Sequence, residues 1–499
     1  MLLLALILVP VVAALPAYFL GPRPAKLGVL LAVAVAHTAA TAALWVIPRP
    51  SLGNILDLDS LGLIFLTIVS ALFLLGAISS VGYLIEESEH APPASIYCAC
   101  MLLFLAAMTL STTTLHLGLF WVAVEATTLA SAPLIYARGS VRSLEATWKY
   151  LVLCSVGIAL ALLGTFFLAI ASAGFGHTHE WDVLYVPAML DTIPQGSFDA
   201  IWLKAAFVLL LVGYGTKMGL APMHSWLPDA HSEAPSPVSA LLSGALLNCA
   251  FLGILRGYQI CLAAGERAFA DESLMALGLF SLAISALFIY AQTDYKRMLA
   301  YSSIENMGIL AVGLALGGPA VYGSLLHAVN HSVAKALLFL TSGNLLLLYG
   351  SKRVEDVRGA LRLVPITGAL WIAGFLAISG TPPFGPFASK FTILATAAQQ
   401  GRYLVLIGLL LPVAVIFLSM SRIVIGMTTG PRPAHMPGLG KVKRNTWLLI
   451  SPLCLAAMSL GLGLTIPGVL NRNLQQAATS VLGDDHEAET VGLTGDHPP

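Results

Sequence analysis

The chain has 499 residues, of which 58% are hydrophobic and 10% are charged, and its formal net charge is zero. A soluble protein carries about 25% charged residues, so this composition excludes a soluble domain and indicates a polytopic membrane protein. The neutral balance of charge also argues against nucleic acid as a partner. The six cysteines form no C-x-x-C pair, which gives no support for a metal site, an iron–sulfur cluster or a disulfide framework.

Apolar segments of membrane-spanning length recur along the whole chain. A membrane helix needs about 20 mostly apolar residues. This rule predicts an all-α protein with about fourteen spans, at residues 1–20, 27–47, 60–84, 96–112, 113–137, 144–172, 201–222, 237–262, 274–292, 298–316, 319–350, 362–398, 402–428 and 444–470. No basic residue precedes the apolar core of the first span, so we interpret it as a retained helix rather than a cleaved signal peptide.

The distribution of basic residues predicts the orientation in the membrane. Connections after odd-numbered spans hold most of the lysines and arginines, whereas those after even-numbered spans hold only Arg49, Arg267 and Arg402. The odd-numbered connections should therefore face the cytoplasm, with both termini on the outer side of a prokaryotic inner membrane. Residues 471–499, which end in an acidic stretch with glycine and proline, are predicted to form a disordered tail.

Lys217 lies in an otherwise apolar segment, where a charge costs at least about 2.5–3.5 kcal/mol, and is therefore a candidate functional residue. The helix is predicted to break close by, at Gly213, Gly215 and Pro222. Backbone groups freed by a break need water or polar side chains, so the break should line a wet cavity. A second break, predicted at Pro382, Pro383 and Gly385, precedes Lys390. Paired breaks in two halves of a chain indicate an ion path between two repeats.

Glu125 lies near the middle of a predicted span. It either hydrogen-bonds to a neighbouring helix or serves as the carboxylate partner of Lys217. Because proximity stabilises both charges, a Glu–Lys pair whose separation changes can load or release a proton. Four further polar residues follow the first break and are candidates to relay protons toward the cytoplasm: His224, Asp229, His231 and Glu233.

His327, His331 and Lys335 recur every four residues and form one stripe on a helix. Histidines exchange protons near neutral pH, so the stripe suits proton relay; alternatively the histidines bond to Asn330 and Ser332. As a metal site the stripe is weak, because it includes neither a carboxylate nor a cysteine.

Four other polar residues leave alternatives open. Lys204 either joins the path of Lys217 or extends its amine to the membrane interface. Glu305 either supports the path or pairs near the interface with Lys296 or Arg297. Lys390 is either a proton carrier or a lysine at a helix end that reaches the headgroups. Asn248 cannot carry a proton, which favours a structural role between helices.

Four motifs carry a family resemblance: KMGLAPMHSWLPDAHSEAP from residue 217, DYKRMLAYSSIENMGI from 294, HAVNHSVAKALLFLTSGN from 327, and the broken helix ending at Lys390. They resemble the antiporter-like proton-conducting subunits of respiratory complex I, multisubunit Na⁺/H⁺ antiporters and membrane-bound group 4 nickel-iron hydrogenases. The SSIE and HxxNHS forms are most similar to component F of the hydrogenase-4 type. The resemblance covers residues 96–428.

The resemblance implies two inverted five-helix repeats, each with a broken helix, at residues 96–262 and 274–428. Three N-terminal helices in residues 1–95 precede them, and a C-terminal helix at 444–470 follows. It also implies that Glu125 is the family's glutamate in the fifth helix and that Lys217 is its lysine partner in the broken seventh. Lys390 matches the terminal lysine of the broken twelfth helix. Asn248 stands where the family often has a lysine, which puts the lysine-to-lysine relay in doubt at that step.

The function implied is that of a proton-translocating subunit of a redox-driven respiratory or hydrogenase complex. Protons would pass from Lys217 through Lys335, His331 and His327 to Lys390. No redox centre is expected in this chain. Iron–sulfur clusters, with nickel-iron or flavin, are expected in partner subunits, which would include peripheral electron-transfer subunits and other antiporter-like and small hydrophobic membrane subunits. The alternatives are a multisubunit Na⁺/H⁺ antiporter and a membrane partner in inorganic-carbon uptake.

Overall fold

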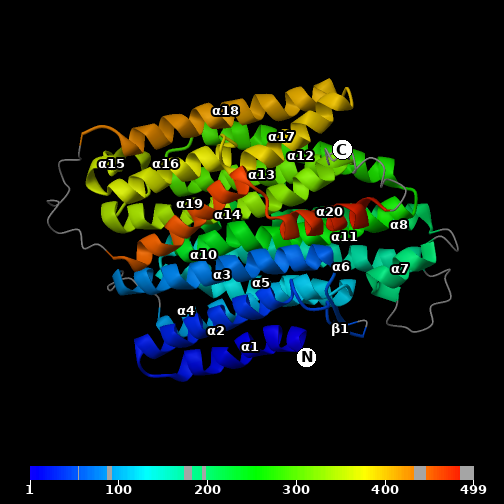
Figure 1. The fold of residues 1–499 in the computed structure, drawn as a ribbon, viewed down its shortest axis with the longest axis horizontal. Coiled ribbons are helices and arrows are strands. Elements are labelled where there is room, and N and C mark those ends of the chain that lie inside the picture. The colour runs from blue at the N-terminus through cyan, green and yellow to red at the C-terminus, as the bar shows by residue number, and fades with distance from the viewer. Residues whose placement is uncertain (54, 87–92, 173–182, 194–197, 432–444, 484–499) are drawn as a thin grey trace, which may run out of the picture.

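The computed structural model describes residues 1–53, 55–86, 93–172, 183–193, 198–431 and 445–483. Most of these residues lie in α-helices that run side by side along the longest dimension of the molecule (Figure 1). Within this part of the chain, thirteen helices are long and apolar enough to cross a membrane. The prediction of an all-α polytopic membrane protein is therefore confirmed.

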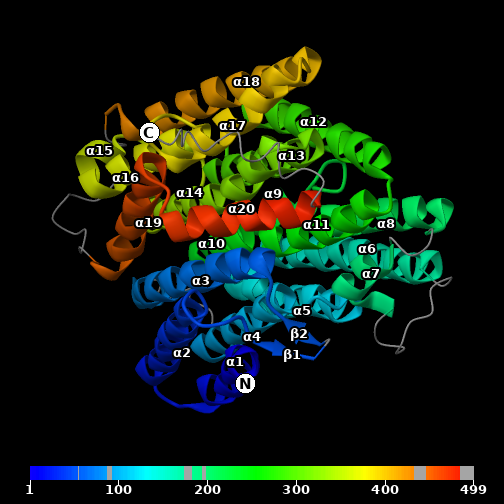
Figure 2. The ribbon, with the colours of Figure 1, turned by 45° about the vertical axis from the view of Figure 1, so that its right-hand side comes forward.

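The N-terminal helices form one flank of the bundle, and α18 (Tyr403–Thr428) lies on the other (Figure 2). A short antiparallel hairpin, in which Ser51 pairs with Asp57, joins the second helix to the third. The elements of this flank are α1 (Leu2–Phe19), α2 (Arg23–Ala43), β1 (Ser51–Leu52), β2 (Leu56–Asp57), α3 (Ser60–Glu86) and α4 (Ala94–Thr113).

The next segment contains the first broken crossing and the region that includes Asn248. Its elements are α5 (Leu117–Ile135), the 3₁₀ turn η1 (Tyr136–Arg138), α6 (Val141–Ala171), α7 (Val186–Thr192), α8 (Ala200–Met218), α9 (Trp226–Glu233), α10 (Ser236–Leu241), the π-helical turn η4 (Leu242–Leu246) and α11 (Leu247–Ala263). The helix from α10 through α11 is buried along almost its whole length, which places it at the centre of the bundle.

The last part of the bundle holds the second broken crossing. Its elements are α12 (Arg267–Tyr290), α13 (Tyr295–Leu316), α14 (Pro319–Tyr349), the 3₁₀ turn η5 (Val354–Asp356), α15 (Ala360–Leu363), α16 (Pro365–Ser379), α17 (Gly385–Gln399) and α18. The predicted span at residues 362–398 forms two half-helices, α16 and α17, separated by the predicted break. Pro382 and Pro383 lie between them, where a residue without a backbone N–H interrupts helical hydrogen bonding.

The first break begins later than predicted. Gly213 and Gly215 lie inside α8, and the helix ends where Gly219 adopts the left-handed conformation at φ 87°. Gly213 instead allows close packing, because a Cβ there would lie 2.6 Å from the backbone nitrogen of Ala161 on α6. Pro222 lies within the break, as predicted, and Gly385 begins α17 rather than interrupting it.

Part of the predicted disordered tail is instead helical and belongs to a third broken crossing. α19 (Trp447–Leu464) is followed by α20 (Gly468–Leu482), which continues in the same direction across the bundle (Figure 1). Leu474, Ala477 and Val481 recur at helical spacing and are buried, whereas the residues between them are mostly polar. This polar composition hid the helix from a search for apolar spans. The prediction of disorder is therefore wrong for residues 471–482, and residues 484–499 lie outside the described part of the chain.

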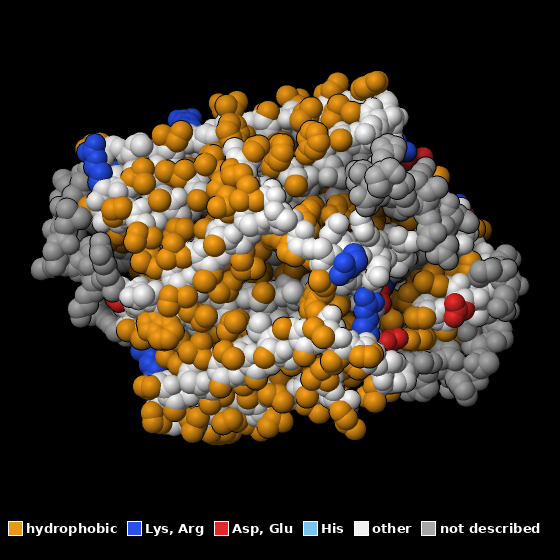
Figure 3. Space-filling view, in the orientation of Figure 1, with side chains coloured by type: hydrophobic (Ala, Val, Ile, Leu, Met, Phe, Trp, Pro, Cys, Tyr) orange, Lys and Arg blue, Asp and Glu red, His pale blue; other side chains and the backbone are white. Residues whose placement is uncertain are grey.

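The bundle has two polar ends separated by an apolar surface. We call one the basic end, because it carries the connections from α5 to α6, α12 to α13 and α14 to α15, with Arg138, Arg297 and Lys352. The opposite end carries the β-hairpin and the connection from α11 to α12. Hydrophobic side chains cover most of the face between them (Figure 3). This surface suits a protein surrounded by lipid.

Candidate functional site

Titratable side chains are buried between the central helices of the bundle. The buried lysines, histidines and glutamate of α8, α9, α13, α14 and α17 are Lys217, His231, Lys296, Glu305, His327, His331, Lys335 and Lys390. All of these except Lys296 were predicted as site residues from the sequence; His37 on α2 and Arg256 on α11 are also buried and were not predicted. Burying a charge in an apolar environment is costly unless polar groups surround it, so the partners of each side chain define the site.

Lys217 occupies the last turn of α8, next to the break. Its ammonium donates to the hydroxyl oxygen of Thr128 on α5 and, at 3.2 Å, to that of Tyr150 on α6. It also lies 5.1 Å from the centre of the Tyr150 ring. The C-terminus of a helix favours a cation, so the end of α8 adds to these contacts. Lys217 is thereby held at membrane depth by neutral oxygens.

Glu125 and Lys217 meet through a hydroxyl group. One carboxylate oxygen of Glu125 accepts a hydrogen bond from Ser155 at 2.8 Å, and the other accepts from Thr128 at 3.4 Å. Since Thr128 also accepts from Lys217, it stands between the two charges. The predicted partners are therefore close, but linked by Thr128 rather than in a direct ion pair. A small shift of Thr128 would change how strongly Glu125 stabilises the charged lysine.

The break after α8 is closed by protein groups. The indole N–H of Trp226 donates to the carbonyl of Thr216 at 2.8 Å, and Ser281 accepts from the amide of Ala221 at 2.9 Å. His224 lies in this break beside the rings of Phe288 and Tyr301. Side chains of other elements therefore satisfy backbone groups that the missing helical turn leaves free.

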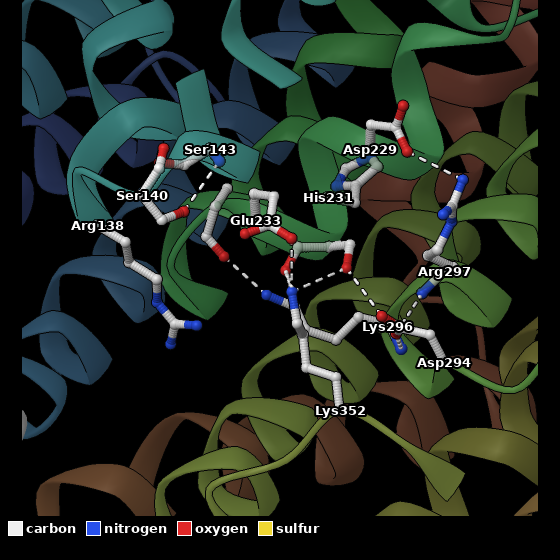
Figure 4. Close-up of polar contacts among 12 residues, drawn as sticks. Arg138, Ser140, Ser143, Asp229, His231, Glu233, Asp294, Lys296, Arg297 and Lys352 are labelled. Atoms are coloured by element: carbon white, nitrogen blue, oxygen red, sulfur yellow. Dashed lines mark hydrogen bonds and ion pairs between the residues drawn. The ribbon is translucent and has the colours of Figure 1, made fainter. Parts of the chain in front are cut away.

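A network of ion pairs surrounds α9 at the basic end (Figure 4). Asp229 pairs with Lys149 on α6 at 3.0 Å and with Arg297 on α13 at 2.9 Å. Glu233 pairs with Lys352 at 2.7 Å. Two of the predicted relay residues, Asp229 and Glu233, thus belong to a network of ion pairs that connects the first broken crossing to the second half of the chain.

Lys296 was missed as a site residue. The sequence indicates only a basic residue near a helix end, whereas the structure buries it completely, with its ammonium 2.7 Å from the carbonyl of Ala234. The signal available was Asp294, whose carboxylate accepts from the amides of Lys296 and Arg297 and so caps α13. Such a cap sets the helix start and therefore points Lys296 inward.

The predicted stripe on α14 is buried, and its members have different partners. His327 bonds through Nδ1 to Ser389 at 2.9 Å and through Nε2 to Asn306 at 3.0 Å. Lys335 donates to Ser302 and, at 2.6 Å, to the carbonyl of Leu299. The ring centres of His327 and His331 are 6.4 Å apart.

Two fully buried histidines have free ring nitrogens. Among the described residues, neither nitrogen of His331 nor of His231 has a hydrogen-bond partner. His231 stacks on Phe339 with 4.9 Å between ring centres. Buried polar atoms normally have partners, and a proton or a water molecule would supply one here.

Asn248 joins the two halves of the site. Its amide donates to the hydroxyl of Ser332 at 2.7 Å and to the carbonyl of Gly244 at 2.8 Å. Ser332 lies on α14 beside His331, so Asn248 bridges α11 and the stripe. The sequence favoured a structural role for this residue, and these contacts between α11 and α14 agree with that role.

Lys390 forms a buried ion pair with Glu305. The ammonium lies 3.1 Å from the carboxylate and also donates to the carbonyl of Ile378 at 3.0 Å. The alternative that Glu305 pairs with Lys296 or Arg297 is therefore wrong. Asn306 connects this pair to His327, because its amide donates to Glu305 at 3.4 Å and its oxygen bonds to the histidine.

We call the row of buried polar residues from Lys217 through Asn248 and the α14 stripe to Asn306, Glu305 and Lys390 the buried polar axis, and Lys204 lies away from it. It pairs with Glu266 at 3.0 Å near the opposite end, and 41% of its side chain is exposed. The structure therefore brings Lys217, the α14 stripe and Lys390 together but places Lys204 at the surface. Among the described residues, no group of three or more His, Cys, Asp or Glu side chains could hold a metal ion.

The helical bundle, its two broken crossings and the buried polar axis are features of a known family of membrane proteins. Residues 114–416 match the family described as NADH:quinone oxidoreductase/Mrp antiporter, transmembrane. The match covers more than half of the chain, so the chain belongs to this family, as the motifs predicted. It is an antiporter-like, proton-translocating membrane module.

Individual proteins of this family are similar to the chain over most of its length. The chain is 36% identical over 391 residues to the hydrogenase-4 component F homolog of Methylacidiphilum infernorum, covering 76% of this chain and 80% of the relative. It is 30% identical over 419 residues to NADH-quinone oxidoreductase subunit N of Desulforudis audaxviator, covering 82% and 81%. Hydrogenase-4 component B of Escherichia coli is also 30% identical, but the chain covers 50% of it.

Solved structures share the fold over nearly the whole chain. A chain of the Mrp complex from Dietzia sp. superposes with a TM-score of 0.83 at 21% identity, covering 98% of this chain and 99% of the other. A chain of respiratory complex I from Thermus thermophilus gives 0.76 at 24% identity, covering 93% and 97%. At these identities the likeness shows that the chain shares its fold with subunits of these two complexes.

Proposed function

We propose that this chain is the proton-translocating membrane subunit of a redox-driven complex of the hydrogenase-linked type. The observation that carries the proposal is the buried polar axis from Lys217 to Lys390, which joins two broken crossings through the α14 stripe. The similarity to a hydrogenase-4 component F homolog over 80% of that protein favours this branch.

Protons enter from the basic end, which faces the cytoplasm in this proposal. Asp229, His231 and Glu233 lie on α9 between that end and Lys217. From Lys217, the path crosses to α14 near Asn248, which bonds to Ser332. Water is required at this step because an amide cannot carry a proton.

The second half of the path uses the α14 stripe and the terminal ion pair. Lys335 and His331 pass the proton to His327, and Asn306 links His327 to the pair of Glu305 and Lys390. A cavity of 420 Å³ lies between α14, α17 and α20 and is lined in part by Thr392, Asn471 and Gln475. It offers polar space near the α17 half-helix for release toward the opposite end.

The energies of these contacts suit a pump. Moving one elementary charge against 100 mV costs about 2.3 kcal/mol. Two unit charges 4 Å apart attract each other by about 4 kcal/mol at an effective dielectric constant of about 20. The ammonium of Lys390 and the carboxylate of Glu305 are 3.1 Å apart. Opening or closing this contact therefore changes the free energy of a proton by enough to offset its movement against about 100 mV.

Redox energy would come from partner subunits. We place iron–sulfur clusters, with nickel-iron or flavin, in peripheral electron-transfer subunits, and further antiporter-like and small hydrophobic subunits beside this chain in a prokaryotic inner membrane. A multisubunit Na⁺/H⁺ antiporter is the second candidate. The 29% identity over 454 residues to the Na⁺/H⁺ antiporter subunit A1 of Staphylococcus aureus favours it.

The first experiment is purification from the native membrane, followed by identification of the companions. Iron–sulfur and nickel-iron subunits would support the redox-driven proposal. Recovery of small antiporter subunits alone would support the second candidate. A soluble zinc-bearing partner without a redox subunit would contradict both and favour inorganic-carbon uptake.

The second experiment compares two lysines on one helix. The complex is reconstituted in liposomes, and proton uptake is followed with a pH-sensitive dye. We expect Lys217→Ala to abolish uptake and Lys204→Ala to leave it nearly unchanged, because Lys204 is an exposed residue outside the buried axis. Equal effects of the two substitutions would contradict the proposed path.

A further inference from the structure

A cavity at the basic end stands apart from the buried axis. It lies between the end of α12, the turn η5 and the second half of α18, and its volume is 720 Å³. Ligand sites in proteins usually measure about 300–1,000 Å³. Both basic and apolar side chains line it, among them Arg353, Arg358, Arg422, Val415, Leu418 and Ile423.

Acidic side chains neutralise the arginines of the cavity only in part. Arg353 pairs with Glu355 at 2.7 Å, and Arg358 donates to the carbonyl of Gly426 at 3.3 Å. Within the described part of the chain, the Arg422 guanidinium forms neither an ion pair nor a hydrogen bond. Three arginines thus face a single glutamate, and the cavity attracts an anion.

Exposed apolar side chains lie on the two long helices that border the cavity. Leu418 on α18 is 67% exposed, and Leu287 on α12 is 66% exposed. Arg422 lies six residues before the end of α18, about 9 Å along the helix axis at 1.5 Å per residue. An arginine at this depth extends its guanidinium toward the headgroups while its stem stays among apolar groups.

We propose that this cavity binds an anionic glycerophospholipid. Arg422 and Arg358 would hold its phosphate, because the planar guanidinium matches phosphate oxygens with two parallel hydrogen bonds. The acyl chains would lie along α12 and α18 past Leu287 and Leu418. Basic pockets between membrane helices commonly bind such headgroups. The site does not depend on the proposed proton path.

The test counts lipids on the intact purified complex by native mass spectrometry. The probes are phosphatidylglycerol, phosphatidylcholine and inorganic phosphate, each added after removal of native lipid. We expect phosphatidylglycerol to be retained in preference to phosphatidylcholine. Arg422→Gln should weaken its binding about fivefold, because one basic residue at an anionic surface contributes about 1 kcal/mol.

The matched control is Arg142→Gln. Arg142 is an exposed arginine at the start of α6, at the same end of the bundle but outside the cavity. It should leave binding unchanged, and Arg358→Gln provides a second variant within the site. Equal losses for Arg142→Gln and Arg422→Gln would overturn the proposal. So would displacement of the lipid by inorganic phosphate, or release of a protein subunit by Arg422→Gln with the lipid count unchanged.

Discussion

The ammonium of Lys390 lies 3.1 Å from the carboxylate of Glu305, and this buried ion pair joins α17 to α13. The pair sits beside the second break, at the end of the polar axis. Lys390 and Glu305 are 85 residues apart in the chain, so only the fold brings them together.

Removing one member of this pair should destabilise the protein more than removing both. Glu305→Gln or Lys390→Met leaves a buried charge unpaired, which costs about 3–5 kcal/mol. The double variant should recover most of the lost thermal stability, yet all three variants should fail to translocate protons. Thermal unfolding of the purified complex and dye-based proton uptake measure the two effects.

Lys204→Met is the control for this prediction. It removes a lysine from the exposed pair with Glu266, and such pairs contribute about 0.2–1 kcal/mol. Its stability and transport should remain near those of the unmodified protein. Proton uptake by the double variant at the normal rate would show that the pair serves stability alone.

Thr128→Val should separate Glu125 from Lys217 without changing the shape of the site. Valine lacks the hydroxyl that accepts from Lys217 and donates to Glu125. An unsatisfied buried donor costs about 1–3 kcal/mol. Each 1.4 kcal/mol added to the barrier of the proton step would slow transport about tenfold.

Initial rates of proton uptake, compared at equal protein content, measure this change. Thr165→Val is the matched control, because the Thr165 hydroxyl bonds only to the carbonyl of Ala161 in its own helix. Identical rates for the two valine variants would mean that the hydroxyl bridge has no part in transport.

The buried lysines of the candidate site could be predicted because a charge is conspicuous in an apolar sequence. Lys217 and Lys390 were predicted from apolar segments beside the two breaks and Lys335 from its spacing to two histidines, and all three are buried. Lys296 was missed because it follows a connection between two spans, where lysines and arginines indicate only the orientation in the membrane. Its burial depends on the cap at Asp294, a local contact that composition does not reveal.

Two features could not be predicted from the sequence: which residue pairs with Glu305, and the presence of helix α20. Glu305 has basic neighbours in sequence, yet its partner, Lys390, comes from the second broken crossing. The search for apolar spans also missed α20, which buries Leu474 and Val481 on one face but is polar elsewhere. Long-range pairing and amphipathic helices both depend on which surfaces meet in the fold.

Asp59 should stabilise the contact between α3 and α11 above acidic pH. Burial by itself would raise the pKa of Asp59, but the Arg256 guanidinium at 2.7 and 2.8 Å, with the amide of Gly62 and the charge of Arg49, holds the pKa below the ordinary value of the carboxyl group. A depressed pKa contributes stability above the unfolded-state value, which is lost as the pH falls through the folded-state value. Asp59→Asn should therefore cost about 1.5–3 kcal/mol at neutral pH.

The measurement is the thermal midpoint of the two proteins as a function of pH. The gap between Asp59→Asn and the unmodified protein should be constant near neutrality and close as the pH falls below 3.8. Glu272→Gln, at an exposed position on α12, should leave the midpoint unchanged throughout. A gap that widens on acidification would contradict the assigned direction of the pKa.

Gly213→Ala should force α8 away from α6 and so disturb Lys217 one turn later. The added Cβ would lie 2.6 Å from the backbone nitrogen of Ala161 and from the carbonyl oxygen of Gly157, and backbone atoms cannot swing aside. Overpacking of this kind costs about 1–3 kcal/mol. Gly461→Ala on α19 meets no atom within 4 Å and should instead stabilise its helix by about 0.5–1 kcal/mol. We expect a lower thermal midpoint and slower proton uptake for Gly213→Ala alone; parallel behaviour of the two alanine variants would refute the close-packing role of Gly213.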